Sequence, residues 1–124
     1  MEYVITKIAR QKMAAARNNT GTIARVKYIA LGTGGTESDG SIRCPLAQDV
    51  GLKNEIIRKE FTSTATSSDT SYEYTIRLSE SECVGESISE IALIDEDGDT
   101  VAIACFLPKG KDDAPVEYSI EDTY

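Results

Sequence analysis

Residues 87–106 constrain the fold more than any other part of the chain, because they predict two β-strands joined by a tight acidic turn. Gly98 supplies the positive φ that such a turn needs. Alternation along the strands then divides the apolar side chains between two faces of the hairpin. One face is predicted to carry Ile91, Leu93, Val101, Ile103 and Cys105, and the other Ile88, Ala92, Ile94, Ala102, Ala104 and Phe106. Both faces must therefore be covered, by the chain's own helix or by another subunit.

The size of the chain indicates one domain, spanning residues 1–124. Hydrophobic residues make up 40% of it, so the core is expected to be compact or shared with a partner. No apolar run approaches the ~20 residues of a membrane span. A signal peptide is not expected either, because Lys7, Arg10 and Lys12 interrupt the only candidate stretch. We therefore expect synthesis in the cytoplasm and no membrane partner.

The rest of the chain predicts one helix and several short strands. The helix is expected from Glu2 to about Arg17, with apolar residues at helical spacing and basic residues on the opposite side. Strands are expected near residues 25–31, 54–65, 71–78 and 116–120, the middle two forming a second hairpin. Residues 36–53 lack periodicity and predict a long loop that a partner could order. The predicted fold class is α+β, an N-terminal helix packed on a mainly antiparallel sheet of about six strands.

Charge is distributed unevenly along the chain. The net charge is −8, which argues against nucleic acid as a partner. Residues 1–27 carry six basic groups and one acidic group, giving +5, whereas residues 28–124 carry seven basic and twenty acidic groups, giving −13. A basic end and an acidic body could dock head to tail between copies. A solvated helix face beside an acidic surface is the preferred interpretation.

The residue inventory offers little catalytic chemistry. The chain has no histidine, which removes the commonest general base and rules out Ser/His/Asp and Cys/His arrangements. Cys44, Cys83 and Cys105 are widely spaced and predict reduced thiols rather than a metal site, with Cys105 buried in a strand. We therefore expect a protein that is not an enzyme and uses no cofactor.

Two motifs allow a binding function as the alternative. Residues 32–35 (Gly-Thr-Gly-Gly) follow a predicted strand, as phosphate-binding glycines do, but without the rest of any phosphate-loop pattern, so a turn that ends the strand is preferred. Residues 95–99 (Asp-Glu-Asp-Gly-Asp) suggest a calcium loop, yet their glycine comes fourth rather than sixth, which favours a hairpin tip. The alternative function is therefore a small binding module with a calcium- or ligand-binding acidic turn.

Tyrosines also allow two interpretations. Tyr72, Tyr74 and Tyr118 alternate with neighbours in predicted strands and could form a carbohydrate or nucleic-acid platform. Packing in the core or at a subunit interface is the preferred interpretation, because the chain contains no Trp and only two Phe.

Three segments in order resemble the N-terminal domain of phage tail-collar fibre proteins and the corresponding parts of phage-tail-like bacteriocins. The first runs from the helix at residues 7–16 into Tyr28-Ile29-Ala30-Leu31-Gly32-Thr33-Gly34-Gly35; the second is Leu52-Lys53-Asn54-Glu55-Ile56-Ile57-Arg58-Lys59; the third is residues 88–98 followed by Val101-Ala102-Ile103-Ala104. The resemblance spans most of residues 5–106. Family members commonly continue into a fibre shaft and a receptor-binding tip, whereas this sequence stops at Tyr124, so host recognition is not carried over.

The resemblance implies a structural virion component that joins a fibre to the baseplate of a phage, prophage or phage-tail-like particle. Its expected partners are further copies of itself and other tail, baseplate or fibre proteins, and its expected location is the phage tail, after synthesis in the bacterial host cytoplasm. The predicted interface residues are Arg10 and Arg17 for docking, and Ile88, Ile91, Ile94, Ile103 and Phe106 for packing. A homo-oligomer at micromolar concentration is the expected state.

Overall fold

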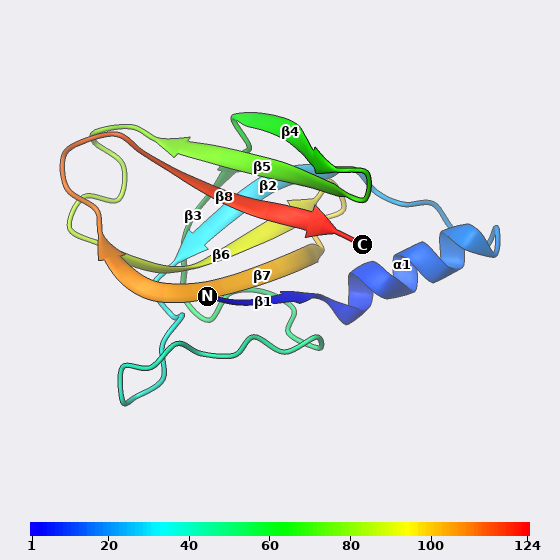
Figure 1. Cartoon of the computed structure of the whole chain (residues 1–124), viewed down its shortest axis with the longest axis horizontal. Helices are drawn as coiled ribbons and strands as arrows, with labels where there is room; N and C mark the ends of the chain where they lie inside the picture. Colours follow the sequence, from blue (N-terminus) through cyan, green and yellow to red (C-terminus); the bar gives the residue numbers. More distant parts are fainter.

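The computed structural model describes residues 1–124 as one helix and eight strands in two antiparallel sheets (Figure 1). The elements are β1 (Glu2–Ile5), α1 (Lys7–Arg17), β2 (Val26–Gly32), β3 (Glu55–Glu60), β4 (Ser63–Ser68), β5 (Ser71–Leu78), β6 (Ser87–Asp95), β7 (Thr100–Gly110) and β8 (Val116–Thr123). The larger sheet has the order β1-β7-β6-β2-β3 and the smaller one β4-β5-β8. The predicted α+β class is confirmed, as a mainly β structure with one N-terminal helix. No helix has the length and apolar character needed to cross a membrane.

The helix begins later than its sequence pattern predicts. Residues 2–5 form β1, which pairs with β7 from Glu2 opposite Cys105 to Ile5 opposite Ala102. Thr6 then caps α1, because its hydroxyl accepts a hydrogen bond from the Ala9 amide and donates one to a β7 carbonyl. The prediction of a helix from Glu2 is therefore wrong for one turn: pairing with the edge of β7 takes precedence over helical spacing.

Strands β6 and β7 form the predicted hairpin, but the predicted composition of its faces is wrong. Ile91 lies opposite Ala104 and Leu93 opposite Ala102, so these residues share a face. Ile103 lies opposite Ala92 and belongs to the other face. At the tip Ile94 lies opposite Thr100, but a β-bulge between Leu93 and Ile94 shifts the pairing by one residue, so that Leu93 lies opposite Ala102 rather than Val101. A one-residue shift moves the side chains that follow to the other face, and alternation within each strand does not contain that information. Gly98 has φ +87°, as the turn requires.

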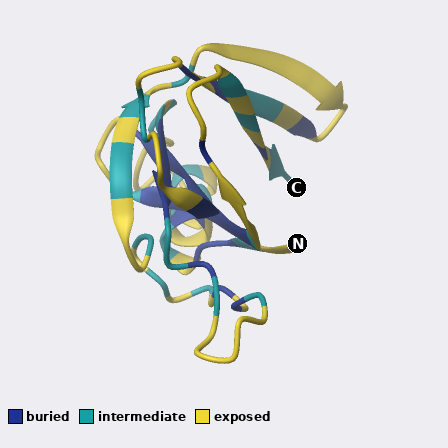
Figure 2. Cartoon of the chain, turned by 90° about the vertical axis from the view of Figure 1, so that its left-hand side faces the viewer, coloured by how far each residue is buried: buried dark blue, intermediate teal, exposed yellow.

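Both faces of this hairpin are covered by the chain itself. One face packs between the two sheets and against α1; its core is made of Ile5, Ala9, Ile29, Leu31, Ile76, Leu78, Ile88, Ile91, Leu93, Val101, Ala102, Ala104 and Ile120. The other face holds Ala30, Ala92, Ile94, Ile103 and Cys105, and Ile42 and Leu52 from the 36–53 loop pack against it. The burial colours of Figure 2 place the most deeply buried residues on these central strands. The prediction of covered faces is confirmed, and no second subunit is needed to cover them.

The second predicted hairpin is divided between the sheets. Strand β3 pairs with β2, whereas β4 pairs with β5, so residues 54–65 are not one strand. The chain changes sheets at residues 61–62, where the Phe61 ring contacts Tyr74 edge to face with centroids 5.0 Å apart. The half-buried Phe61 thus marks the point where the chain leaves β2, and β4 lies at the edge of the smaller sheet.

Candidate functional site

The structure places the predicted interface isoleucines inside the protein. Ile88, Ile91, Ile94 and Ile103 are all at most 1% exposed within a single chain. Phe106 is half-buried and stacks on Tyr118 with ring centroids 6.2 Å apart. A partner could reach the isoleucines only if the core opened. The prediction that they form an interface is therefore corrected: the chain's own loop and second sheet supply the cover that the sequence pattern requires.

The predicted docking arginines lie at the surface, on α1. Lys7, Arg10 and Arg17 are exposed, and none of them forms a salt bridge. Because α1 turns about 100° per residue, these three side chains leave the helix on one side. We call them the basic stripe. Its charges face solvent and are free to pair with an acidic surface.

A groove with an acidic rim lies where β1 and β8 approach each other. It has a volume of about 260 Å³ and is lined by Met1, Tyr3, Glu73, Ala104, Ser119, Ile120, Glu121 and Thr123. Glu73 and Glu121 are directly opposite each other in the β5–β8 ladder, and neither is in a salt bridge. Like charges in this position repel. We call this feature the acidic groove; its like-charged pair favours a cationic side chain from outside.

The sequence pattern does not predict this groove, because it assigns residues 2–5 to a helix and not to β1. The Tyr3 hydroxyl donates to the Glu121 carbonyl at 2.6 Å, which joins the edges of the two sheets. Burial, together with the charge of Asp122, raises the pKa of Tyr3 to about 12. Burial also raises the pKa of Asp122, whose Oδ1 is buried without a hydrogen-bond partner. Only the pairing of the first strand with β7 brings these residues together.

Glu90 is a fully buried carboxylate that holds the 33–54 segment on β6. It accepts backbone N–H bonds from Gly34 at 2.8 Å, Lys53 at 3.0 Å and Asn54 at 2.9 Å. Arg43 contributes a charged contact at 3.2 Å and also reaches Asp49 at 3.3 Å. A buried carboxylate needs such a complete set of donors.

The amides of the glycine-rich segment, which could otherwise bind an external anion, are therefore already hydrogen-bonded to side chains of β6. The amide of Gly34 donates to Glu90, and that of Gly35 donates to the Ser89 hydroxyl at 2.9 Å. A side chain at Gly35 would overlap the Ser89 carbonyl. The glycines are thus required by the close approach of β6, and the preferred interpretation as the end of a strand is confirmed by β2 ending at Gly32.

The acidic turn is occupied by a lysine of α1. The Lys12 ammonium lies 2.7 Å from Asp95, 3.0 Å from Asp97 and 2.7 Å from Asp99. Partial burial opposes the charged form, but the three carboxylate hydrogen bonds raise the pKa of Lys12 above its usual value. Asp95 also accepts the amides of Asp97 and Asp99 at 3.0 Å. A calcium ion would have to displace Lys12, so the arrangement favours a structural hairpin tip over the calcium alternative.

The remaining candidates also pack structurally. Cys105 is buried, as predicted, and burial raises its pKa to about 11, which leaves the thiol protonated at neutral pH. Burial likewise raises the pKa of Cys83, while Cys44 is exposed and all three cysteines are free. Tyr74 and Tyr118 pack against Phe61 and Phe106, but Tyr72 is exposed, so the tyrosines form no continuous platform.

Comparisons with protein families, curated proteins and solved structures find no match to this chain. The candidate site is therefore defined by the chain's own surface, namely the basic stripe and the acidic groove.

Replacing Glu90 with Gln is expected to destabilise the protein strongly. The amide group of Gln would place donors against the amides and guanidinium that now face the carboxylate, so the free energy of unfolding should fall by about 3 kcal/mol. Urea unfolding followed by circular dichroism measures the change. Glu55→Gln is the matched control, because Glu55 forms an exposed pair with Arg58 and its loss should cost less than about 0.5 kcal/mol. Equal losses for both variants would show that the buried network has no special role.

Replacing Lys12 with Met is expected to lower stability by about 2 kcal/mol, because Asp95 is then left buried beside two further carboxylates. Lys7→Met, which removes an unpaired surface charge, should change the stability by less than about 0.5 kcal/mol.

In the native protein, millimolar calcium should leave the melting temperature unchanged, since Lys12 holds the site. Scanning calorimetry tests both statements, and a calcium-dependent rise in the native protein would support the binding-module alternative instead.

Proposed function

We propose that this chain is a structural component of a phage tail, prophage or phage-tail-like particle, where it attaches a fibre to the baseplate. The three resembling segments lie on the elements that build the body: α1 with β2, the loop leading into β3, and the β6–β7 hairpin. Their apolar residues are used for the core. The surface is thus free to serve as a connection between proteins.

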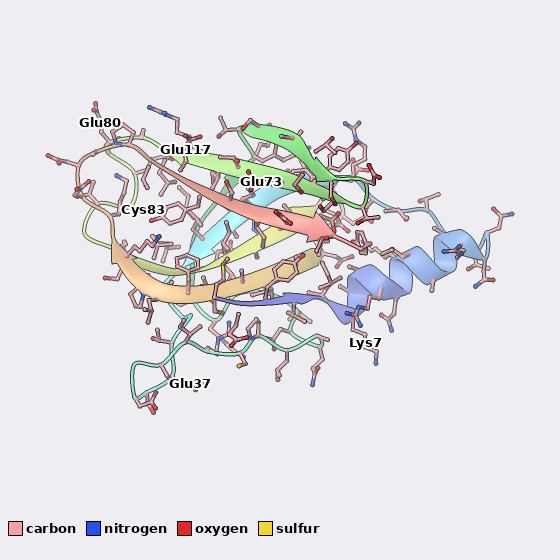
Figure 3. The ribbon with its side chains drawn as sticks, viewed as in Figure 1. Lys7, Glu37, Glu73, Glu80, Cys83 and Glu117 are labelled. Carbon is pink, nitrogen blue, oxygen red and sulfur yellow. The ribbon has the colours of Figure 1, made fainter.

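The observation that carries the proposal is the separation of charge between two surfaces. Figure 1 shows α1 extending to one side of the sheets, and in Figure 3 Lys7 lies well apart from Glu73 and Glu117 on the smaller sheet. The basic stripe and the acidic groove are both unpaired within the chain. An arginine guanidinium can bind a carboxylate through two parallel N–H···O bonds, and the stripe offers two arginines for the two carboxylates of the groove. The stripe of one copy can therefore dock on the groove of the next.

Such a contact is heterologous, because each copy uses two different surfaces. Repetition of a heterologous contact closes into a ring or extends into a chain. A ring or a stack of subunits suits a part that joins a fibre to the end of a tail. The same two surfaces are also available to other particle proteins of complementary charge.

Reversing the charge of the stripe tests this contact. Arg10→Glu with Arg17→Glu should convert the oligomer expected at micromolar concentration to monomers, as measured by light scattering after size exclusion. Arg25→Glu with Lys109→Glu is the matched control, since both residues are exposed, form no salt bridge and lie outside α1. Adding Glu73→Arg and Glu121→Arg to the first variant should restore association. A native chain that is monomeric at every concentration and salt condition would contradict the contact.

The particle assignment has its own test. In the bacterium that carries the gene, neighbouring genes should encode tail tube, baseplate or fibre proteins, and the chain should sediment with purified particles and be identified by mass spectrometry. Deletion of the gene should leave particles whose tails lack attached fibres in electron micrographs. Recovery of the chain only in fractions without particles would refute the proposal.

A further inference from the structure

Strand β4 is an exposed edge whose outer side has no partner. It is the terminal strand of the smaller sheet, and all six of its residues, Ser63–Ser68, are exposed (Figure 2). In an antiparallel ladder, alternate residues of an edge strand direct their N–H and C=O groups outward. These groups on β4 face solvent, and the strand has neither a charge nor a proline to block pairing with another strand.

The other sheet edges are protected. β3 carries Glu55, Arg58, Lys59 and Glu60, charges of the kind that discourage edge pairing. β1 contains only four residues. β8 lies beside the acidic groove, where the Tyr3 hydroxyl already binds the Glu121 carbonyl. Strand β4 is therefore the edge most open to another chain.

The sequence of β4 indicates which strand fits there. Residues 63–67 read Ser-Thr-Ala-Thr-Ser, the same in both directions. When two identical strands pair antiparallel about a two-fold axis perpendicular to the sheet, opposed side chains point to the same face. The axis must then lie midway between two copies of the same residue. Any other centre would place a residue opposite one that points to the other face, because successive side chains along a strand alternate between faces. Centred on Ala65, this pairing places Ala against Ala, Thr64 against Thr66, and Ser63 against Ser67.

The two central kinds of opposed pair, Ala with Ala and Thr with Thr, are compatible. Thr–Thr neighbours can hydrogen-bond across strands, and the alanine methyl groups meet without crowding. Ser67 lies in the bulge with its hydroxyl 2.8 Å from that of Ser71, so the favourable pairing is that of residues 64–66. The regular pairing with β5 covers residues 63–66, with the bulge between Thr66 and Ser68, so the centre of the palindrome lies on a regular strand. The register that the two-fold axis requires is thus also the register that the side chains favour.

Charge selects the antiparallel direction. Asp69 follows β4 in the turn that leads to β5. In antiparallel pairing about Ala65, Asp69 lies near Phe61 of the second copy, and the two Asp69 carboxylates are separated by about 27 Å along the strands. Parallel pairing in register would place them side by side in a chain whose net charge is already −8. A second copy related by a two-fold axis avoids that repulsion.

We propose that β4 pairs with β4 of a second copy about a two-fold axis at Ala65, which joins the two three-stranded sheets into one sheet of six strands. This contact is distinct from the docking of stripe on groove and does not depend on the particle assignment. A six-residue strand pair buries less than the ~1,200 Å² of a typical stable interface, so the dimer should be weak, dissociating in the range of about 0.1–1 mM.

Disulfide trapping tests the pairing. Ala65→Cys is made in a chain carrying Cys44→Ser and Cys83→Ser, with Arg10→Glu and Arg17→Glu to remove docking of the stripe. Opposed Cα atoms in antiparallel strands are about 4.5–5.5 Å apart, within the span of a disulfide. In a glutathione buffer the variant should form covalent dimer at least about tenfold faster than Thr22→Cys, an exposed residue in a loop. Equal rates for the two cysteines would overturn the proposal.

A charge at the axis gives an independent measurement. In the chain that carries Arg10→Glu and Arg17→Glu, Ala65→Lys places two ammonium groups opposite each other, so the dimer seen by sedimentation up to about 1 mM should weaken at least about tenfold. Thr22→Lys adds the same charge elsewhere and should leave the dimer unchanged. Both sites are exposed, so unchanged melting temperatures show that the fold is intact. A chain that stays monomeric at 1 mM, or a dimer indifferent to Ala65→Lys, would overturn the pairing. Neither result bears on whether the chain sediments with tail particles.

Discussion

The buried carboxylate of Glu90 is the interaction on which much of this structure depends. It lies on β6, at the centre of the larger sheet, and collects amides from both ends of the 33–54 segment as well as the guanidinium of Arg43. This holds an irregular segment against the sheet, where Ile42 and Leu52 cover Ile94 and Ile103. Without that cover, the outer face of the hairpin would be an apolar surface in need of a partner. The network thus converts a potential subunit interface into a part of the core.

The sequence pattern located the main elements because they depend on local signals. The acidic turn with Gly98 and the two apolar faces predicted the β6–β7 hairpin and its burial on both sides. The same pattern could not say what would provide the cover, since a loop held by Glu90 and a second subunit satisfy an apolar face equally well. For this reason the predicted isoleucines are core residues, whereas Arg10 and Arg17, chosen for their charge, are at the surface.

Pairing between distant segments accounts for the other errors. Residues 2–5 fit a helical spacing, but β7 offers them an edge, and Thr6 separates the two structures by capping α1. The pattern of residues 54–65 predicts one strand, but β3 pairs with β2 and β4 with β5, and the Phe61 ring packs on Tyr74 where the chain changes sheets. These outcomes depend on which strands become neighbours, which a local pattern does not contain. The acidic groove follows from the same pairing and was missed for the same reason.

The two proposed contacts have different symmetry, and this determines what they can build together. The β4 contact is isologous and ends at two copies, whereas the contact between stripe and groove is heterologous and repeats. The β4 contact would be formed by backbone hydrogen bonds, which salt screens little. The contact between stripe and groove would be formed by exposed charges, so it should weaken as ionic strength rises. A chain with both contacts can form a ring or a filament through its charges and join two such assemblies through β4. The β4 contact, which is weak alone, should become strong only when many copies are held together, as the proposed tail assembly would hold them.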